Sequence, residues 1–133
     1  MSLILLATDA DWLYEEVDAT LADEGTRVHR VRAGAHVAPA IAVEVPDLVI
    51  LDLQIGNMGG MATCLDLRLD EGAGRLPHLP ILMLLDRDDD LFLARRAQAD
   101  GWLIKPFDGF RLRRAARALL DGETFFDERH VAV

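Results

Sequence analysis

The sequence is poor in residue types that several kinds of site require. Its single cysteine, Cys64, cannot form an internal disulfide or a multi-cysteine metal site, and we expect it to be buried as a small hydrophobic residue. Ser2 is the only serine, so a catalytic serine triad lacks a suitable nucleophile. The four histidines show no metal-ligand spacing and are expected at the surface or in turns. They are His29, His36, His78 and His130.

Long apolar runs and an excess of positive charge are also missing. The longest apolar runs, residues 3–7 and 81–85, have five residues each, whereas a membrane span needs about 18. The amino terminus has no basic segment and cleavage site of a secretory signal, so we expect a cytoplasmic protein. Fourteen basic against 23 acidic residues leave a net charge of −9, which argues against nucleic acid as a partner.

The sequence does contain enough apolar residues to fold. With 133 residues, of which 51% are hydrophobic, it fits one domain with a sizeable core. Short apolar runs alternate with segments of helical periodicity. The expected strands are residues 3–7, 26–31, 48–51, 81–85 and 101–104, and the expected helices are 9–24, 35–45, 61–72, 88–99 and 108–119. This alternation predicts a doubly wound parallel sheet in a three-layer α/β sandwich.

Charged residues follow four of the predicted strands. Asp9, Asp52, Asp86 and Lys105 would meet at the carboxyl edge of the sheet, where such folds place their sites. Carboxylates brought together repel unless a cation lies between them, and Mg²⁺ is a suitable cation because it binds few carboxylates and keeps its waters. Lys105 is the only lysine, although each aspartate taken alone could simply cap a helix or begin a turn.

Four separated segments carry a family resemblance. They are Leu3 to Leu6 leading to Asp9, Pro46 to Leu53, Leu79 to Leu84, and Gly101 to Phe107 with its Lys-Pro-Phe motif. In this order and spacing they resemble the receiver domain of two-component response regulators. The resemblance covers residues 1–121 and leaves 122–133 as a C-terminal tail. It implies a flavodoxin-like (βα)5 fold with a five-stranded parallel sheet, in a stand-alone protein similar to the chemotaxis regulators.

The resemblance also implies roles for individual residues. Asp52 would accept a phosphoryl group from a sensor histidine kinase or a small phosphodonor, and Lys105 would pair with that group. Asp9, Asp52 and the backbone carbonyl of Gln54 would bind Mg²⁺. Trp102 occupies the aromatic position whose side chain moves on activation. Receivers of this kind are signalling phosphoacceptors and not enzymes.

Several positions depart from the family pattern. Thr8 replaces one of two adjacent acids, so we expect weak Mg²⁺ binding. Leu85 replaces the hydroxyl-bearing switch residue and cannot donate to a phosphoryl oxygen, a contact typically worth about 1.5 to 3 kcal/mol. Asp86 stands where a small residue is common, and could restore a carboxylate or crowd the phosphate. The bond before Pro106 is often cis in this family.

The output partner is unidentified, but the face built from the fourth helix, fifth strand and fifth helix is the expected surface. Arginines on these helices suggest an acidic patch on the partner, with a solvated surface as the alternative. They are Arg95, Arg96, Arg111, Arg113, Arg114 and Arg117. The tail residues Phe125 and Phe126 could fold back onto the domain or hook a partner, and the sequence does not choose between these.

Three classes of function are therefore compared. The first is a phosphorylation-dependent response regulator that signals by protein–protein interaction, indicated by Asp9, Asp52 and Lys105. The second is a phosphorylation-independent pseudo-receiver adaptor, indicated by Thr8 and Leu85. An aspartyl phosphatase of the haloacid dehalogenase type is disfavoured, because its second catalytic aspartate is replaced by glutamine two residues after Asp52 and the chain has no cap domain.

Overall fold

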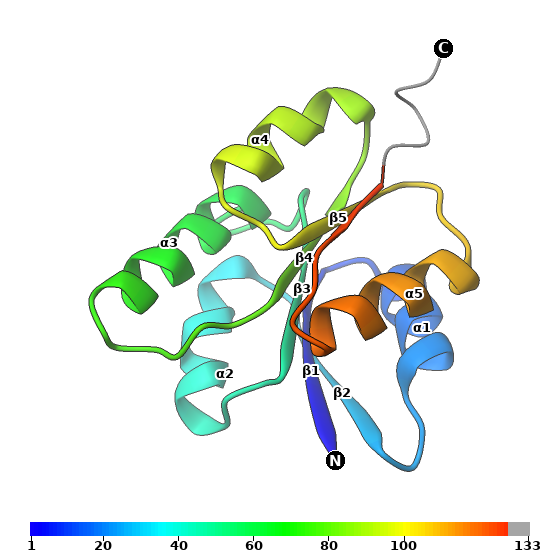
Figure 1. Cartoon of the computed structure of the whole chain (residues 1–133), viewed down its shortest axis with the longest axis horizontal. Helices are drawn as coiled ribbons and strands as arrows, with labels where there is room; N and C mark the ends of the chain where they lie inside the picture. The colour runs from blue at the N-terminus through cyan, green and yellow to red at the C-terminus, as the bar shows by residue number, and fades with distance from the viewer. Residues whose placement is uncertain (128–133) are drawn as a thin grey trace.

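The computed structural model describes residues 1–127, so His130 and the end of the tail lie outside it. Strands and helices alternate along the chain as predicted (Figure 1). The strands are β1 (Ser2–Ala7), β2 (Thr26–Val31), β3 (Leu48–Asp52), β4 (Ile81–Leu85), β5 (Gly101–Ile104) and β6 (Phe125–Phe126). The helices are α1 (Asp11–Leu21), α2 (Val37–Val43), α3 (Gly60–Gly72), α4 (Leu91–Arg96) and α5 (Gly109–Leu120), with 3₁₀ turns η1 (Gly34–His36) and η2 (Asp88–Asp90).

The strands form one parallel sheet in the order β2-β1-β3-β4-β5-β6. The first five strands confirm the doubly wound (βα)5 prediction, and the two-residue β6 extends the sheet beyond β5. The chain moves outward from β1 to β2 and then crosses to β3 on the other side. Ligand sites in such sheets lie at the carboxyl ends of the strands beside this switch point.

The sheet is covered by helices on both faces, with α2, α3 and α4 on one and α1 and α5 on the other (Figure 1). Successive strand side chains point to opposite faces. In β3, Leu51 therefore packs in the cluster with α2, α3 and α4, whereas Ile50 packs in the cluster with α1 and α5. Burial on both faces explains why β3 and β4 are apolar on consecutive residues.

Two local predictions on helices have different outcomes. Pro39 lies in the first turn of α2, as expected from its missing N–H. The prediction that the fourth helix reaches Ala99 is wrong, because α4 ends at Arg96. Gln98 adopts a left-handed φ of 63°, and the N–H of Ala99 donates back to the carbonyl of Ala94 at 3.2 Å. This is a Schellman ending, which usually uses glycine.

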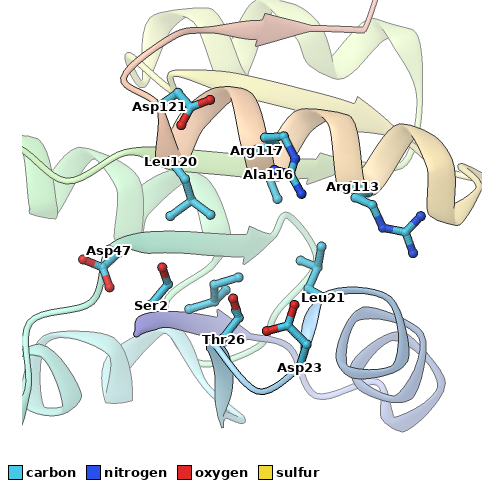
Figure 2. Close-up of a pocket in the computed structure, with 11 residues that line it drawn as sticks. Ser2, Leu21, Asp23, Thr26, Asp47, Arg113, Ala116, Arg117, Leu120 and Asp121 are labelled. Carbon is cyan, nitrogen blue, oxygen red and sulfur yellow. The ribbon is translucent and has the colours of Figure 1, made fainter.

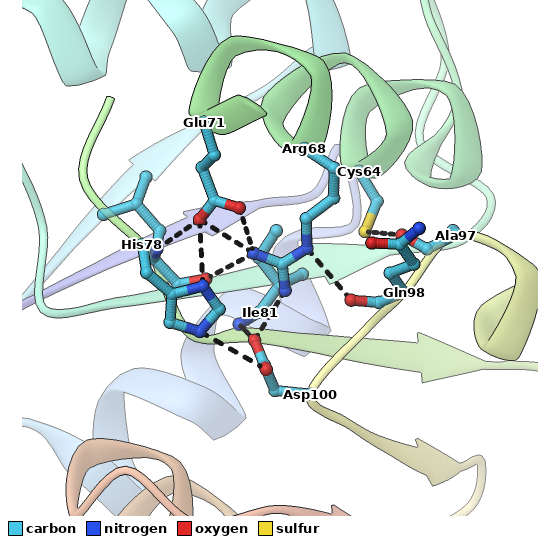
Figure 3. A network of polar contacts seen from close by, with 9 residues as sticks. Cys64, Arg68, Glu71, His78, Ile81, Ala97, Gln98 and Asp100 are labelled. Atoms are coloured by element: carbon cyan, nitrogen blue, oxygen red, sulfur yellow. Dashed lines mark hydrogen bonds and ion pairs between the residues drawn. The ribbon is translucent and has the colours of Figure 1, made fainter. Parts of the chain in front are cut away.

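A partly buried polar network attaches α3 to the starts of β4 and β5 (Figure 3). Arg68 donates to the carboxylates of Glu71 at 2.9 Å and Asp100 at 2.6 Å. These carboxylates also accept the backbone N–H groups of Leu79 at 2.6 Å and Ile81 at 2.8 Å. The network thus fixes the amino-terminal edge of the sheet, away from Asp52.

The tail folds back onto the domain, which the sequence had left open. Phe125 pairs with Gly101 and Phe126 with Trp102, so β6 lies along the outer edge of β5. Within residues 1–127, no helix has the length and apolar character needed to span a membrane.

Candidate functional site

Four polar side chains meet at the carboxyl edge of the sheet. The register pairs Ala7 with Leu51 and Asp52 with Leu84, which places Thr8 opposite Asp52 and Asp86 two residues beyond the position opposite Asp52. By the alternation of side chains along a strand, each of these three residues points to the face of the sheet covered by α1 and α5. Lys105, two residues after Leu103 of β5, points to the same face. Strand alternation therefore directs all four side chains to the same side.

Lys105 is the positive centre of this site. Its Nζ lies 2.7 Å from Asp52 Oδ1 and 3.1 Å from Asp86 Oδ1. Burial alone would lower the pKa of Lys105, but the hydrogen bonds and charges of Asp52 and Asp86 outweigh it and raise that pKa above its ordinary value. The ammonium therefore stays charged, and two carboxylates share it.

Thr8 holds the second oxygen of Asp52. The Thr8 hydroxyl donates to Asp52 Oδ2 at 2.8 Å and accepts the N–H of Ala10 at 3.1 Å. Because Ala10 supplies a donor, the hydroxyl proton is directed toward the carboxylate. Thr8 and Asp52 are both buried. The residue that replaces a family acid thus binds the central aspartate directly, a contact that sequence reasoning did not anticipate.

Asp86 brings a second negative charge to the site. Its side chain is 32% exposed and pairs with Lys105 through Oδ1. Asp86 Oδ2 is buried and has no hydrogen-bond partner among the described residues. Such an orphaned oxygen is costly, since buried polar atoms are usually paired. Asp86 thus competes with Asp52 for Lys105 and retains an unused acceptor.

The expected Mg²⁺ ligands are arranged less tightly. Asp9 is exposed and makes no hydrogen bond or ion pair with residues 1–127. Its carboxylate lies beside Gly56, since a Cβ added to that glycine would be 3.8 Å from Asp9 Oδ2. The N–H of Gln54 donates to Asp52 Oδ1 at 3.3 Å, which places this backbone at the site. No group of three His, Cys, Asp or Glu in the described part of the chain could hold a metal. Two carboxylates and a carbonyl still suit Mg²⁺, which takes one or two carboxylates and keeps its waters.

Leu85 and Trp102 lie on the opposite face of the sheet from Lys105. Both are buried in the cluster with α3 and α4. Trp102 is 2% exposed, and its Nε1 donates to the carbonyl of Asp127 at 3.3 Å. Sequence reasoning identified Trp102 but missed Asp127, because nothing in the sequence around Asp127 indicates where its carboxylate docks. The bond between Lys105 and Pro106 is cis, as expected.

Two pockets differ in position and character. An apolar pocket of about 310 Å³ adjoins the site and is lined by Trp12, Glu16, Lys105, Pro106 and Phe107. A polar pocket of about 390 Å³ lies at the opposite, amino-terminal edge of the sheet between α5 and the ends of β1 and β2 (Figure 2). Its charged lining residues are Asp23, Asp47, Arg113, Arg117 and Asp121.

The arginines of α5 make different contacts in the structure. Arg113 and Arg117 line the polar pocket together with Asp23 (Figure 2), whereas Arg111 and Arg114 contact the tail. Arg114 and Arg117 also line a further pocket beside the tail.

A doubly wound sheet with a buried aspartate and a lysine at its carboxyl edge is the arrangement of a receiver-type signalling domain. Comparison with known proteins agrees. A family model for the response regulator receiver domain matches residues 4–117. The chain belongs to this family, which serves two-component signalling and is not a group of conventional enzymes.

Several full-length regulators are similar in sequence. The DNA-binding response regulator MtrA of Mycobacterium tuberculosis H37Rv is 34% identical over 119 residues, covering 88% of this chain and 50% of MtrA. The transcriptional regulatory protein AfsQ1 of Streptomyces coelicolor is 29% identical over 122 residues, covering 90% of this chain and 52% of AfsQ1. The chain thus spans about half the length of these curated relatives.

Solved structures share the fold. A putative response regulator from Chloroflexus aurantiacus superposes with a TM-score of 0.81 at 25% identity, covering 90% of this chain and 98% of that one. The chemotaxis response regulator CheY4 of Vibrio cholerae gives a TM-score of 0.79 at 24% identity, again covering 90% and 98%. These matches confirm the flavodoxin-like receiver architecture.

Proposed function

We propose that the chain is a receiver that accepts a phosphoryl group on Asp52 and signals by protein–protein interaction as a single domain, residues 1–121, with a tail, residues 122–133. The observation that carries this proposal is the placement of Asp52. Its carboxylate is buried at the end of β3, with Lys105 on one oxygen and Thr8 on the other. A carboxylate held in this way is an oriented nucleophile.

In the proposed step, an oxygen of Asp52 attacks the phosphorus of a phosphohistidine or a small acyl phosphate. An O–P bond forms, the bond from phosphorus to the donor's nitrogen or oxygen breaks, and the donor keeps that electron pair. Lys105 moves from the carboxylate to a phosphoryl oxygen. The apolar pocket beside Lys105, with Trp12 and Phe107 on its walls, is where the donor protein would dock.

Mg²⁺ would be held by Asp9, Asp52 and the carbonyl of Gln54. It would neutralise charge on the phosphoryl oxygens. Because Thr8 supplies a hydroxyl in place of an acid, we propose that this binding is weak. The role of Asp9 would then be to bind the metal, since Asp9 is not among the residues that hydrogen-bond to Asp52 within residues 1–127.

A phosphorylation-independent adaptor is the second candidate, and Leu85 favours it. Its side chain is buried in the core cluster that contains Trp102, and it has no group that could bond a phosphoryl oxygen. In this candidate the fold supplies a docking surface, and occupancy of Asp52 does not change it.

The deciding experiment follows tryptophan fluorescence during addition of Mg²⁺ and then beryllium fluoride, an aspartyl-phosphate mimic. We expect a saturable, Mg²⁺-dependent change that is lost in Asp52→Asn and kept in Asp89→Asn, an exposed acid beyond β4. Intact-mass analysis after treatment with acetyl phosphate should show one adduct. A flat signal without an adduct would reject phosphorylation and leave the adaptor.

A further inference from the structure

The outer edge of β5 is occupied by the tail. The segment that contains β6 runs parallel to β5 (Figure 1). The strand register pairs Phe126 with Trp102. The N–H of Asp127 donates to the carbonyl of Trp102 at 3.2 Å, and Trp102 Nε1 donates to the carbonyl of Asp127 at 3.3 Å. Backbone and side-chain bonds together hold an extended segment on this edge.

The carboxylate of Asp127 anchors the segment. Its side chain is completely buried, Oδ2 accepts the N–H of Ile104 at 3.1 Å, and Oδ1 pairs with Arg111 at 2.6 Å. A buried charge is tolerated only when it is paired and hydrogen-bonded, so an acid is specified at this position. Arg111, on the first turns of α5, supplies the matching cation.

Two aromatic residues complete the contact. Phe126 packs on Trp102 with ring centroids 4.4 Å apart, and the Arg95 guanidinium lies 5.6 Å from the Trp102 ring. Phe125 packs against the core cluster of α1 and α5, with Arg114 5.9 Å from its ring. The two rings therefore bind on different sides of the sheet edge, as alternation along a strand requires.

Gly101 makes room for the segment. A Cβ at this position would lie 2.5 Å from the carbonyl oxygen of Phe125 and 3.0 Å from Leu119 Cδ1. Only a residue without a side chain lets the tail backbone approach β5 this closely. The edge of β5 is thus shaped for an extended strand.

We infer that the edge of β5 and Arg111 form a recognition slot for an extended segment in which two aromatic residues precede a carboxylate. Residues 125–127 fill this slot in cis, and a partner protein carrying such a segment competes for it by strand addition. Because residues 125–127 are covalently linked to the domain, their effective concentration at the slot is in the millimolar range. The partner segment therefore binds well only when residues 125–127 dissociate from the slot. This inference does not depend on phosphorylation of Asp52.

The test uses a fluorescein-labelled peptide with the sequence of residues 121–129 and the full chain carrying Phe126→Ala with Asp127→Asn, which empties the slot. By fluorescence anisotropy, we expect this variant to bind the peptide at least tenfold more tightly than the unchanged protein does. Adding Arg111→Met should abolish the gain. A matched peptide with Asn in place of Asp127 should bind at least tenfold more weakly. Equal binding to both proteins, or to both peptides, would overturn the inference.

A second measurement tests the anchoring role of Asp127 even if the double variant does not fold. In the full chain with Trp12→Phe, Trp102 is the sole tryptophan, and Asp127→Asn should increase its quenching by acrylamide severalfold. Glu123→Gln removes the same charge from an exposed residue of the tail and should not. Quenching that is equal in these two variants would show that the carboxylate does not hold the segment.

Discussion

Asp86 and Asp52 compete for one ammonium group. Lys105 lies within 3.1 Å of both carboxylates, and its charge is divided between them. Any anion approaching Asp52 also meets the charge of Asp86. Charge-assisted hydrogen bonds are typically worth about 1.5 to 3 kcal/mol, so this competition is large enough to affect reaction at Asp52.

Replacing Asp86 should therefore speed phosphorylation. We expect Asp86→Ala to raise the rate of phosphorylation by acetyl phosphate by about tenfold, since a lost competing contact of about 1.4 kcal/mol corresponds to that factor. Intact-mass analysis over time measures the rate. Asp89→Ala removes an exposed acid from the same loop and serves as the control. A slower reaction in Asp86→Ala would mean that Asp86 positions Lys105 instead of competing for it.

Cys64 illustrates how burial sets the chemistry of one group. Burial raises the pKa of its thiol from 9.0 to about 11, with Asp100 and Glu71 adding to the increase and Arg68 opposing it. The unfolded chain loses this proton first as the pH rises. The stabilisation linked to the protonated Cys64 thiol is therefore fully present below pH 9, and the free energy of unfolding decreases as the pH rises toward 11.

The resulting prediction compares the native chain with Cys64→Ala. Between pH 9 and 11, the free energy of unfolding of the native chain should fall by about 2 to 3 kcal/mol more than that of the variant. Urea titrations at several pH values measure the difference, and contributions from other groups cancel in the comparison. Parallel pH profiles for the two proteins would refute the prediction.

At the scale of elements, the Arg68 network attaches α3 to the strands beside it. The Arg68 side chain is 9% exposed and satisfies two carboxylates, which themselves cap backbone N–H groups (Figure 3). Its removal would take the arginine charge away from the largely buried carboxylates of Glu71 and Asp100 and leave them, within residues 1–127, only His78 as an ion-pair partner, which is 67% exposed. Buried pairs broken in this way cost far more than surface pairs.

Arg68→Met should therefore lower the free energy of unfolding by about 3 to 5 kcal/mol. Arg27→Met is the matched control, because Arg27 is 51% exposed and, within residues 1–127, pairs only with exposed Glu44. Its cost should stay below about 1 kcal/mol. Urea denaturation followed by circular dichroism gives both values. Similar costs for the two variants would show that the network contributes no more than a surface pair.

At the scale of the whole molecule, stability should decrease from the centre of the sheet toward β6. The strands β1, β3 and β4 are paired on both sides, and β3 and β4 are buried at every residue. In contrast, β6 has two residues and pairs with β5 alone among the strands of the described part of the chain. Protected amides in core strands usually exchange by global unfolding, whereas edge segments open locally.

Native-state hydrogen exchange by NMR tests this gradient. Amides of β3 and β4 should report a free energy equal to that of global unfolding. The Asp127 amide, bonded to Trp102, should report a value lower by a few kcal/mol. If the two values coincide, the tail belongs to the global folding unit and does not open separately.

The sequence by itself determined the order of the elements and the edge at which charged residues gather. Periodicity and turn residues are local signals, and consecutive apolar residues at 48–51 and 81–85 identify strands buried on both faces. Because strands in such folds are parallel, the sequence also placed Asp52 and Lys105 at the same edge. It could not give the end of α4, since Gln98 takes a conformation that usually requires glycine.

Only the tertiary structure decided which polar atoms meet. The bond from Thr8 to Asp52, the sharing of Lys105 with Asp86 and the docking of Asp127 on Ile104 and Arg111 join residues far apart in the chain. Strand register and side-chain alternation bring these atoms together, and both depend on packing across the whole sheet. Asp127 shows the reason most clearly, because its burial depends on a slot made by β5 and α5 and not on its neighbours in sequence.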